Sequence, residues 1–180
     1  NMEKLGRARF HIQDQEMAFA TGRYMAHAPV RHAFCCDDVC ELVRKNFSGN
    51  VEFHDGDAEI APGVIALRIG GHTSGLQSVC VHTRRGWVVL TSDAAHYYAN
   101  ILEEAPYSVV FDVGAMLEGH RRIKRLAPSH DHIIPGHDPL VLARYPALSP
   151  AHPYIACLHE APRTQPGVSS QPCAHYVVST

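Results

Sequence analysis

Three polar side chains stand in turns at the ends of apolar runs, and their types suit metal binding. His72 follows two glycines in GGHTSG, Asp93 ends WVVLTSD, and His137 ends HIIPGH. Two imidazoles and a carboxylate are donors that suit a borderline cation such as zinc. Each residue alone is ordinary turn chemistry, because histidine and aspartate are frequent in solvated turns and caps. Their occurrence together at three such ends predicts a shared site.

The chain must fold so that these turns meet, and its hydrophobic pattern predicts a strand-rich middle between helices. The predicted strands are residues 8–12, 51–53, 58–60, 64–69, 75–83, 87–93 and 132–137. The predicted helices are residues 13–22, 36–47, 111–127 and 138–146. Alternation and Gly or Pro turns mark the strands, whereas apolar residues three and four apart mark the helices. Side chains at strand ends of a layered α/β fold meet at one edge of the sheet, where sites are built.

Composition and charge narrow the class of protein. A chain of 180 residues that is 46% apolar fits one domain with a sizeable core. The formal net charge of −2 argues against a nucleic-acid surface and against a basic membrane patch. No apolar run approaches the length of a membrane span, and no secretion signal is visible. The six cysteines include no CxxC pair, so we expect free thiols and a cytoplasmic protein.

The chain changes character after Leu148. Residues 149–180 are rich in proline, carry scattered polar residues and show no sustained hydrophobic period. We therefore expect one domain over residues 1–148 and a poorly ordered, Pro-rich tail over residues 149–180. No role for this tail follows from its composition.

The three turns and their flanking runs carry a family resemblance. The segments GVIALRIGGHTSGLQSVCVHTRRGWVVLTSDAAHYYAN and HIIPGHDPLVLARYPA resemble the C-terminal half of the metallo-β-lactamase superfamily, and more narrowly its N-acyl-homoserine lactonase group. The resemblance implies an α/β fold, the αββα sandwich, of which this chain supplies mainly the second half. It also implies that His72 binds one zinc ion, that His137 binds a second, and that Asp93 bridges both.

The activity that the resemblance implies is hydrolysis of a lactone, such as an N-acyl-homoserine lactone. In the complete protein, a metal-bound hydroxide at the dinuclear zinc site would attack the ester carbonyl and open the ring. The implied partner is a small lactone or ester, without nucleic acid or membrane, and a homodimer is common among relatives. Asp93 and His96 are the residues that we expect to take part in catalysis.

The chain departs from the family pattern at two places. The first metal motif of the family, HxHxDH, does not occur in it. We therefore expect that the chain represents an incomplete protein and has little activity alone. The second departure is three residues after Asp93, where related lactonases often carry a tyrosine that can hydrogen-bond the substrate. His96 stands there instead, and it is expected either to donate a proton or to lie at the rim without a catalytic part.

Two other functions stay open. One is a different hydrolase of the same superfamily, which cleaves thioesters or other esters. The other is a truncated or degenerate relative that is not catalytic and keeps the fold for binding.

Outside the three turns, His11 and His54 are expected to have ordinary surface or packing roles, and the charged run around His120 is expected to be a solvated helix face. Phe19 and Tyr24 could either line an acyl pocket or pack in the core.

Overall fold

The computed structural model describes residue 5 and residues 8–163, and within them the central feature is a five-stranded sheet. Its strands, in spatial order, are β3 (Ala58–Ala61), β4 (Val64–Arg68), β5 (Gln77–Thr83), β6 (Gly86–Leu90) and β7 (Ile133–Ile134). The first four pair antiparallel through short turns, whereas β7 joins β6 in parallel. Val88 and Val89 of β6 are buried, as the apolar run at this position predicts for a central strand.

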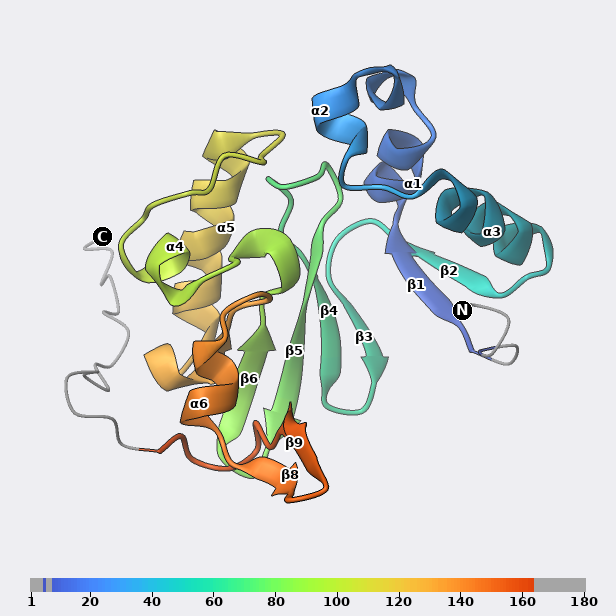
Figure 1. Ribbon diagram of the computed structural model, residues 1–180. Helices are drawn as coiled ribbons and strands as arrows, with labels where there is room; N and C mark the ends of the chain where they lie inside the picture. Colours follow the sequence, from blue (N-terminus) through green and yellow to red (C-terminus); the bar gives the residue numbers. More distant parts are fainter. Residues whose placement is uncertain (1–4, 6–7, 164–180) are drawn as a thin grey trace, which may run out of the picture.

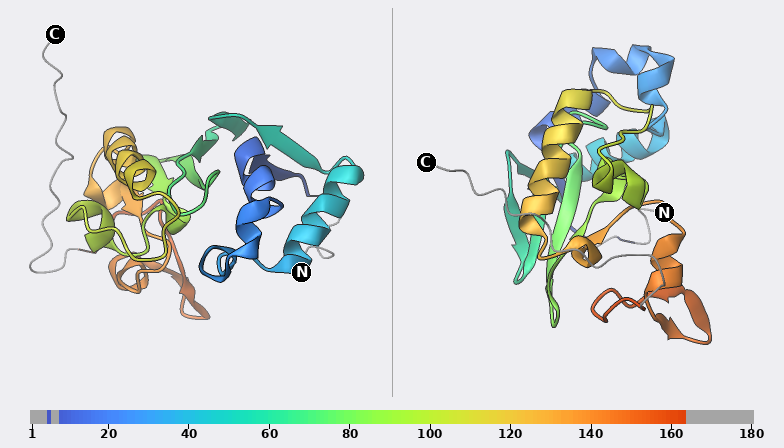
Figure 2. Two further views of the ribbon diagram at one scale, coloured as in Figure 1. Left: turned by 90° about the horizontal axis from the view of Figure 1, so that it is seen from above. Right: turned by 90° about the vertical axis from the view of Figure 1, so that its left-hand side faces the viewer.

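The long helix α5 (Val113–Leu126) covers one face of this sheet (Figures 1 and 2). It begins where Asp112 accepts a hydrogen bond from the backbone N–H of Ala115 at 2.9 Å, which satisfies one of the free N–H groups of the first turn. Met116 and Ile123, seven residues apart on one face, are fully buried against the sheet. Gly119 lets the helix approach β4, because a Cβ there would lie 2.5 Å from Ile69 Cγ2.

Residues 8–54 form a separate block beside β3 (Figure 1). Its two strands, β1 (Phe10–Gln13) and β2 (Val51–His54), pair in parallel, and the chain between them is helical. The helices are α1 (Asp14–Ala20), η2 (Arg23–Ala26), α2 (Ala28–Arg31) and α3 (Cys36–Phe47). The buried side chain of Gln13 joins the block to the sheet, since it hydrogen-bonds Gln77 and the backbone of Gly56.

Short elements follow the sheet strands and carry the turns of interest. They are η3 (Ser92–Ala94), α4 (Tyr98–Leu102), η4 (His130–His132) and α6 (Leu140–Arg144). The helix prediction for 36–47 agrees with α3 residue for residue. Residues 132–137 contain only the two-residue strand β7, and residues 23–34, where no helix or strand is predicted, contain η2 and α2. No helix among the described residues is long and apolar enough to cross a membrane.

The expected tail is structured over its first part. The hairpin β8 (Ala147–Ser149) and β9 (His152–Ala156) spans the expected boundary at residue 148, and β9 packs beside α6. Arg85 secures the segment that follows, because its guanidinium donates to the carbonyl oxygens of Leu158 and Glu160. Residues 149–163 thus include a paired hairpin and hydrogen-bonded contacts with the sheet. The remainder of the expected tail, residues 164–180, lies outside the described residues, and the division into a domain and a tail stays a prediction.

Candidate metal centre

The structure brings the three predicted ligands together around the carboxylate of Asp93. Asp93 lies in η3, directly after β6, and its two oxygens face different histidines. His137 Nε2 lies 2.7 Å from Oδ1, whereas His72 Nε2 lies 3.8 Å from Oδ2. Ser92, which precedes Asp93, has a φ of 51°, so the backbone bends sharply in a region that non-glycine residues rarely adopt. This strained bend turns the carboxylate out at the end of the strand.

His72 is held by the glycine turn that precedes it. Gly71 has a φ of 93°, and a Cβ there would lie 2.6 Å from Met116 Cα, so only glycine fits between the turn and α5. The Nδ1 of His72 lies 2.8 Å from the carbonyl oxygen of Val109. A carbonyl only accepts, so Nδ1 carries a proton, and Nε2, which faces Asp93, is the nitrogen left for a metal. The side chain is 9% exposed, which leaves this orientation little freedom.

His137 reaches the carboxylate because its turn packs directly onto η3. A Cβ on Gly136 would lie 2.6 Å from the carbonyl oxygen of Ser92. The backbone N–H of Gly136 donates to Ala95 at 2.9 Å, and that of His137 donates to His96 at 3.0 Å. These contacts hold the turn after β7 against the turn after β6. The side chains of His137 and Asp93 therefore lie at the same edge of the sheet.

His96 lies in the same group. Its neighbour in space, Tyr107, was not predicted from the sequence as a residue of the site. His96 Nε2 is 3.5 Å from Asp93 Oδ1, and burial lowers the pKa of the ring, with the nearby His137 adding to the effect. The ring of Tyr107 stacks on that of His96 with centroids 3.7 Å apart, and its hydroxyl donates to the backbone carbonyl of Asp93. Burial also raises the pKa of the Tyr107 phenol well above its ordinary value, so Tyr107 stays a neutral donor. No pattern in the loop containing Tyr107 singles it out beforehand.

His120 corrects the prediction of a solvated face on α5. Its side chain is 1% exposed, and its Nε2 lies 2.6 Å from the carbonyl oxygen of Ala94, so Nε2 donates and fixes the residue next to Asp93. Burial lowers its pKa, which keeps the ring neutral at physiological pH. The spacing of His120 from Met116 and Ile123 could have revealed it, because residues four and three apart share a helix face.

The donor set at Asp93 fits a zinc ion. When Nε2 of His72 carries no proton, it and the Oδ2 of Asp93 are both acceptors, and they face each other at 3.8 Å. Ligand atoms around a tetrahedral zinc, each about 2.0–2.2 Å from the metal, lie roughly 3.3 Å from one another. His137 Nε2 and Asp93 Oδ1, at 2.7 Å, form a hydrogen bond, whereas the separations of 3.5 Å from His96 and 3.8 Å from His72 lie close to that value. A cation would satisfy the facing acceptors.

A second cluster, formed by His11, Glu52 and His54 on β1 and β2, does not fit an ion in this arrangement. His11 Nδ1 and His54 Nε2 are 2.9 Å apart, while the ring centroids are 5.2 Å apart and the planes differ by 4°. The rings therefore lie end to end, with the two nitrogens on the line between the centroids. That is an N–H···N hydrogen bond, and an ion between the nitrogens would lie much closer to each than the zinc–nitrogen distance of about 2.0 Å.

Two cavities flank the glycine turn, and only one of them reaches the metal ligands. A cavity of about 440 Å³ is lined by His72, Val109 and Phe111 and, across it, by Pro29 and Val30 near α2. Phe19 and Tyr24 do not line it; they line a separate cavity of about 450 Å³ that contains none of the predicted metal ligands. Phe19 is 5% exposed and packs its ring on that of Phe111 with centroids 4.6 Å apart, which favours core packing for this residue.

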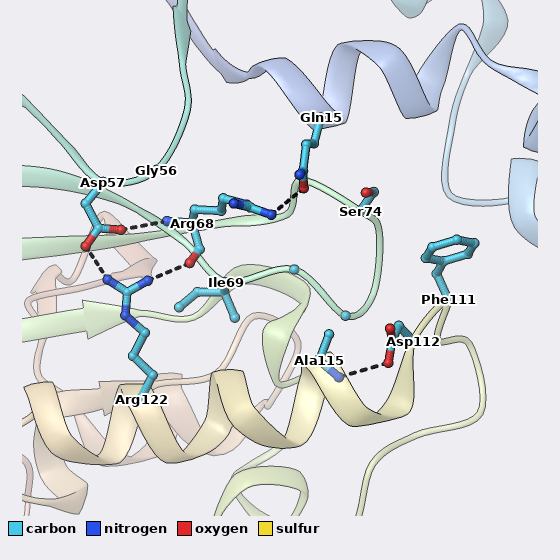
Figure 3. A pocket seen from close by; sticks show the side chains of 12 residues that line it. Gln15, Gly56, Asp57, Arg68, Ile69, Ser74, Phe111, Asp112, Ala115 and Arg122 are labelled. Carbon is cyan, nitrogen blue, oxygen red and sulfur yellow. Dashed lines mark hydrogen bonds and ion pairs between the residues drawn. The ribbon is translucent and has the colours of Figure 1, made fainter.

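The other cavity, of about 530 Å³, lies on the far side of the turn and contains none of the predicted site residues (Figure 3). Two arginines border it, and both are already engaged. Arg68 donates to Gln15, and Arg122 donates to Asp57 and to the backbone carbonyl of Arg68 (Figure 3). Asp57 pairs with Arg122, and Asp55 lies 3.9 Å from Arg68, so acidic side chains offset the positive charge at this cavity.

Sequence comparison finds lactonases as relatives. The chain is 36% identical over 91 residues to an N-acyl homoserine lactonase from a Bacillus species, and 35% identical over 91 residues to one from Bacillus cereus. In both cases the match covers 49% of this chain and 36% of the relative. No family model matches the chain.

Structural comparison extends the likeness over most of the described residues. An N-acyl homoserine lactone hydrolase solved with N-hexanoyl-L-homoserine at its catalytic metal centre matches with a TM-score of 0.57 and 27% identity, over 72% of this chain and 47% of that one. A quorum-quenching N-acyl homoserine lactone hydrolase matches with a TM-score of 0.59 and 26% identity, over 74% and 50%. A hydrolase of the β-lactamase superfamily at 15% identity has a TM-score of 0.51 and shows the fold alone. The chain is thus a lactonase-like relative with the metallo-β-lactamase fold, and it spans about half the length of these structures.

Proposed function

We propose that the protein to which this chain belongs is a zinc-dependent hydrolase that opens a lactone ring. One observation carries the proposal: the two oxygens of Asp93 face His137 on one side and His72 on the other, in a chain similar to N-acyl homoserine lactonases. A carboxylate with a histidine on each side suits a pair of ions that share it. Two zinc ions are proposed for the complete protein.

Each residue of the site has a distinct part. His72 and His137 would hold zinc through the Nε2 atoms that face Asp93, and Asp93, which lies between them, would be the shared ligand. The zinc, when bound, supplies Lewis acidity and lowers the pKa of water. Val109 fixes the ring of His72 through its carbonyl, and Tyr107 fixes the backbone of Asp93. This support from neighbouring groups keeps the ligands in place before the metal arrives.

The cavity beside His72 favours a substrate with an apolar tail. Its volume of about 440 Å³ falls in the usual range for small-molecule sites, and alanine, proline and valine side chains form much of its lining. A lactone at the Asp93 group could extend an acyl chain toward Pro29 and Val30. This supports an acylated lactone over a small unsubstituted ester.

A substrate panel tests the proposal. The complete protein, loaded with zinc, is given lactones with short and long acyl chains and matched thioesters, and the products are identified by mass spectrometry. We expect ring-opened hydroxy acids from the lactones. Cleavage of thioesters alone would favour the second hydrolase class. Zinc binding without turnover of either class would favour a non-catalytic relative.

A further inference from the structure

We propose that His96 is a direct ligand of the ion held by Asp93 and His137. The inference deepens the proposed function, because it concerns the same site, and it gives His96 a different role from the proton donor expected from the sequence. Each of the three residues offers one ligand atom, and all these atoms lie within 4.8 Å of one another. A set of two imidazoles and a carboxylate leaves a fourth position of a zinc tetrahedron open.

The distances favour coordination at one side of the carboxylate. His96 Nε2 and His137 Nε2 both face Oδ1 of Asp93, at 3.5 and 2.7 Å. These values lie around the roughly 3.3 Å that separates two ligands of a tetrahedral zinc. His72 faces the other oxygen, Oδ2, so it stands on the opposite side of the carboxylate.

The ring of His96 is fixed in this orientation before any metal binds. Tyr107 stacks on one of its faces with planes 12° apart, and the edge of the ring meets His137 at 65° with centroids 4.5 Å apart. The carbonyl of His96 also accepts the backbone N–H of His137, which ties the two histidines together at the main chain. A ligand held in place by packing loses little entropy on binding.

The arrangement makes the two sides of Asp93 unequal. Among the described residues, the side of His137 has three ligand atoms, which are Asp93 Oδ1 and the Nε2 atoms of His96 and His137, whereas the side of His72 has two, His72 Nε2 and Asp93 Oδ2. The ion next to His137 should therefore bind more tightly and fill first. A tyrosine in place of His96 would keep the aromatic packing on Tyr107 but would remove the imidazole lone pair.

Cobalt titration of the complete protein tests the ligand role without using turnover. Co²⁺ is added to the metal-free protein against a competing chelator, and its d–d absorption is recorded. Loss of a ligand should lower the cobalt affinity more than loss of a supporting hydrogen bond does. We therefore expect His96→Gln to lower the cobalt affinity of the tighter site by at least about tenfold. His96→Tyr should lose the same cobalt affinity, although its ring can still pack on Tyr107. His82→Gln, on an exposed strand position, is the matched control and should bind as the unchanged protein does.

A cysteine at the same position gives a direct spectroscopic answer. His96→Cys should show a thiolate-to-cobalt charge-transfer band, because cysteine is itself a metal ligand. His82→Cys controls for cobalt bound by the cysteines already present. Unchanged cobalt affinity in His96→Gln, or no such band in His96→Cys, would overturn the ligand role and leave the lactonase proposal untouched. Weakened cobalt binding in a protein that opens no lactone would overturn the function and leave the ligand role standing.

Discussion

Two groups of histidines and carboxylates lie close together in the part of the chain that the structure describes, and one of these two is arranged for a metal. Around Asp93, three imidazole nitrogens approach one carboxylate at 2.7, 3.5 and 3.8 Å from separate turns. On β1 and β2, His11 and His54 meet end to end at 2.9 Å and satisfy each other. Glu52 in that second group is paired with Arg9 at 3.8 Å.

The backbone behind each group explains the difference. The Asp93 group stands on turns pressed against buried structure, with Gly71 on Met116 and Gly136 on Ser92. The other group stands on a two-stranded ribbon, where diagonal neighbours on one face come within reach of each other. Closeness alone therefore does not make a metal site; the lone pairs must converge, and buried contacts must hold them there.

The largest expected effect is the loss of metal on removing the shared carboxylate. Asp93→Ala takes away the ligand that faces both sides, so we expect zinc affinity to fall by at least about a hundredfold, beyond the loss seen for supporting residues. Chelator competition and elemental analysis would measure it. Turnover and zinc content that survive this change would remove the bridging assignment and, with it, the contrast between the two groups.

The second largest effect is expected from the glycine turn that holds His72 in the Asp93 group. Gly71→Ala places a Cβ 2.6 Å from Met116 in a residue with positive φ, and we expect it to cost about 3 kcal/mol of unfolding free energy. Gly49→Ala, in the turn before β2, is the matched control, since its φ of 75° is similar and nothing lies within 4 Å. Its cost should be about 1 kcal/mol, from backbone strain alone. Urea denaturation measures both, and equal costs would contradict the close-packing argument.

A third effect should appear with pH. Burial lowers the pKa of His120 in the folded protein, so the unfolded chain takes up a proton first as pH falls below about 6.5. Stability from this residue is therefore intact above that pH and is lost progressively below it. His120→Gln can still donate to Ala94 and should flatten the stability profile between pH 7 and 5. His152→Gln, at an exposed position, should leave the profile unchanged, and a profile unaffected by His120→Gln would argue against the buried neutral ring.

The smallest effect is expected in the group formed by His11, Glu52 and His54 on β1 and β2. His54→Ala removes one hydrogen bond to His11, worth about 1 kcal/mol, and should leave zinc and cobalt uptake as they are. Denaturation and metal titration on the same samples would check both. A fall in the number of bound ions would mean that the rings can turn to hold a metal, and would end the distinction between the two groups.

Sequence patterns predicted the sheet and its flanking helices well where the periodicity was clear. The alternation in residues 75–83 and the apolar run from 87 predict β5 and β6, and the spacing of Met116 and Ile123 predicts α5. Patterns failed where tertiary contacts decide. β8 and β9 form in a proline-rich segment because β9 and the residues after it pack on α6 and Arg85. His120 is buried among charged neighbours because its side of α5 faces η3.

The sequence by itself determined which residues could bind a metal and that they follow apolar runs, because residue type and strand period are local properties. Only the tertiary structure decided which of them face one another. The structure shows that His96 points at Asp93 beneath Tyr107 and that His11 points at His54. That difference arises from backbone clamps between segments far apart in the chain, such as Gly136 on Ser92, which no local pattern encodes.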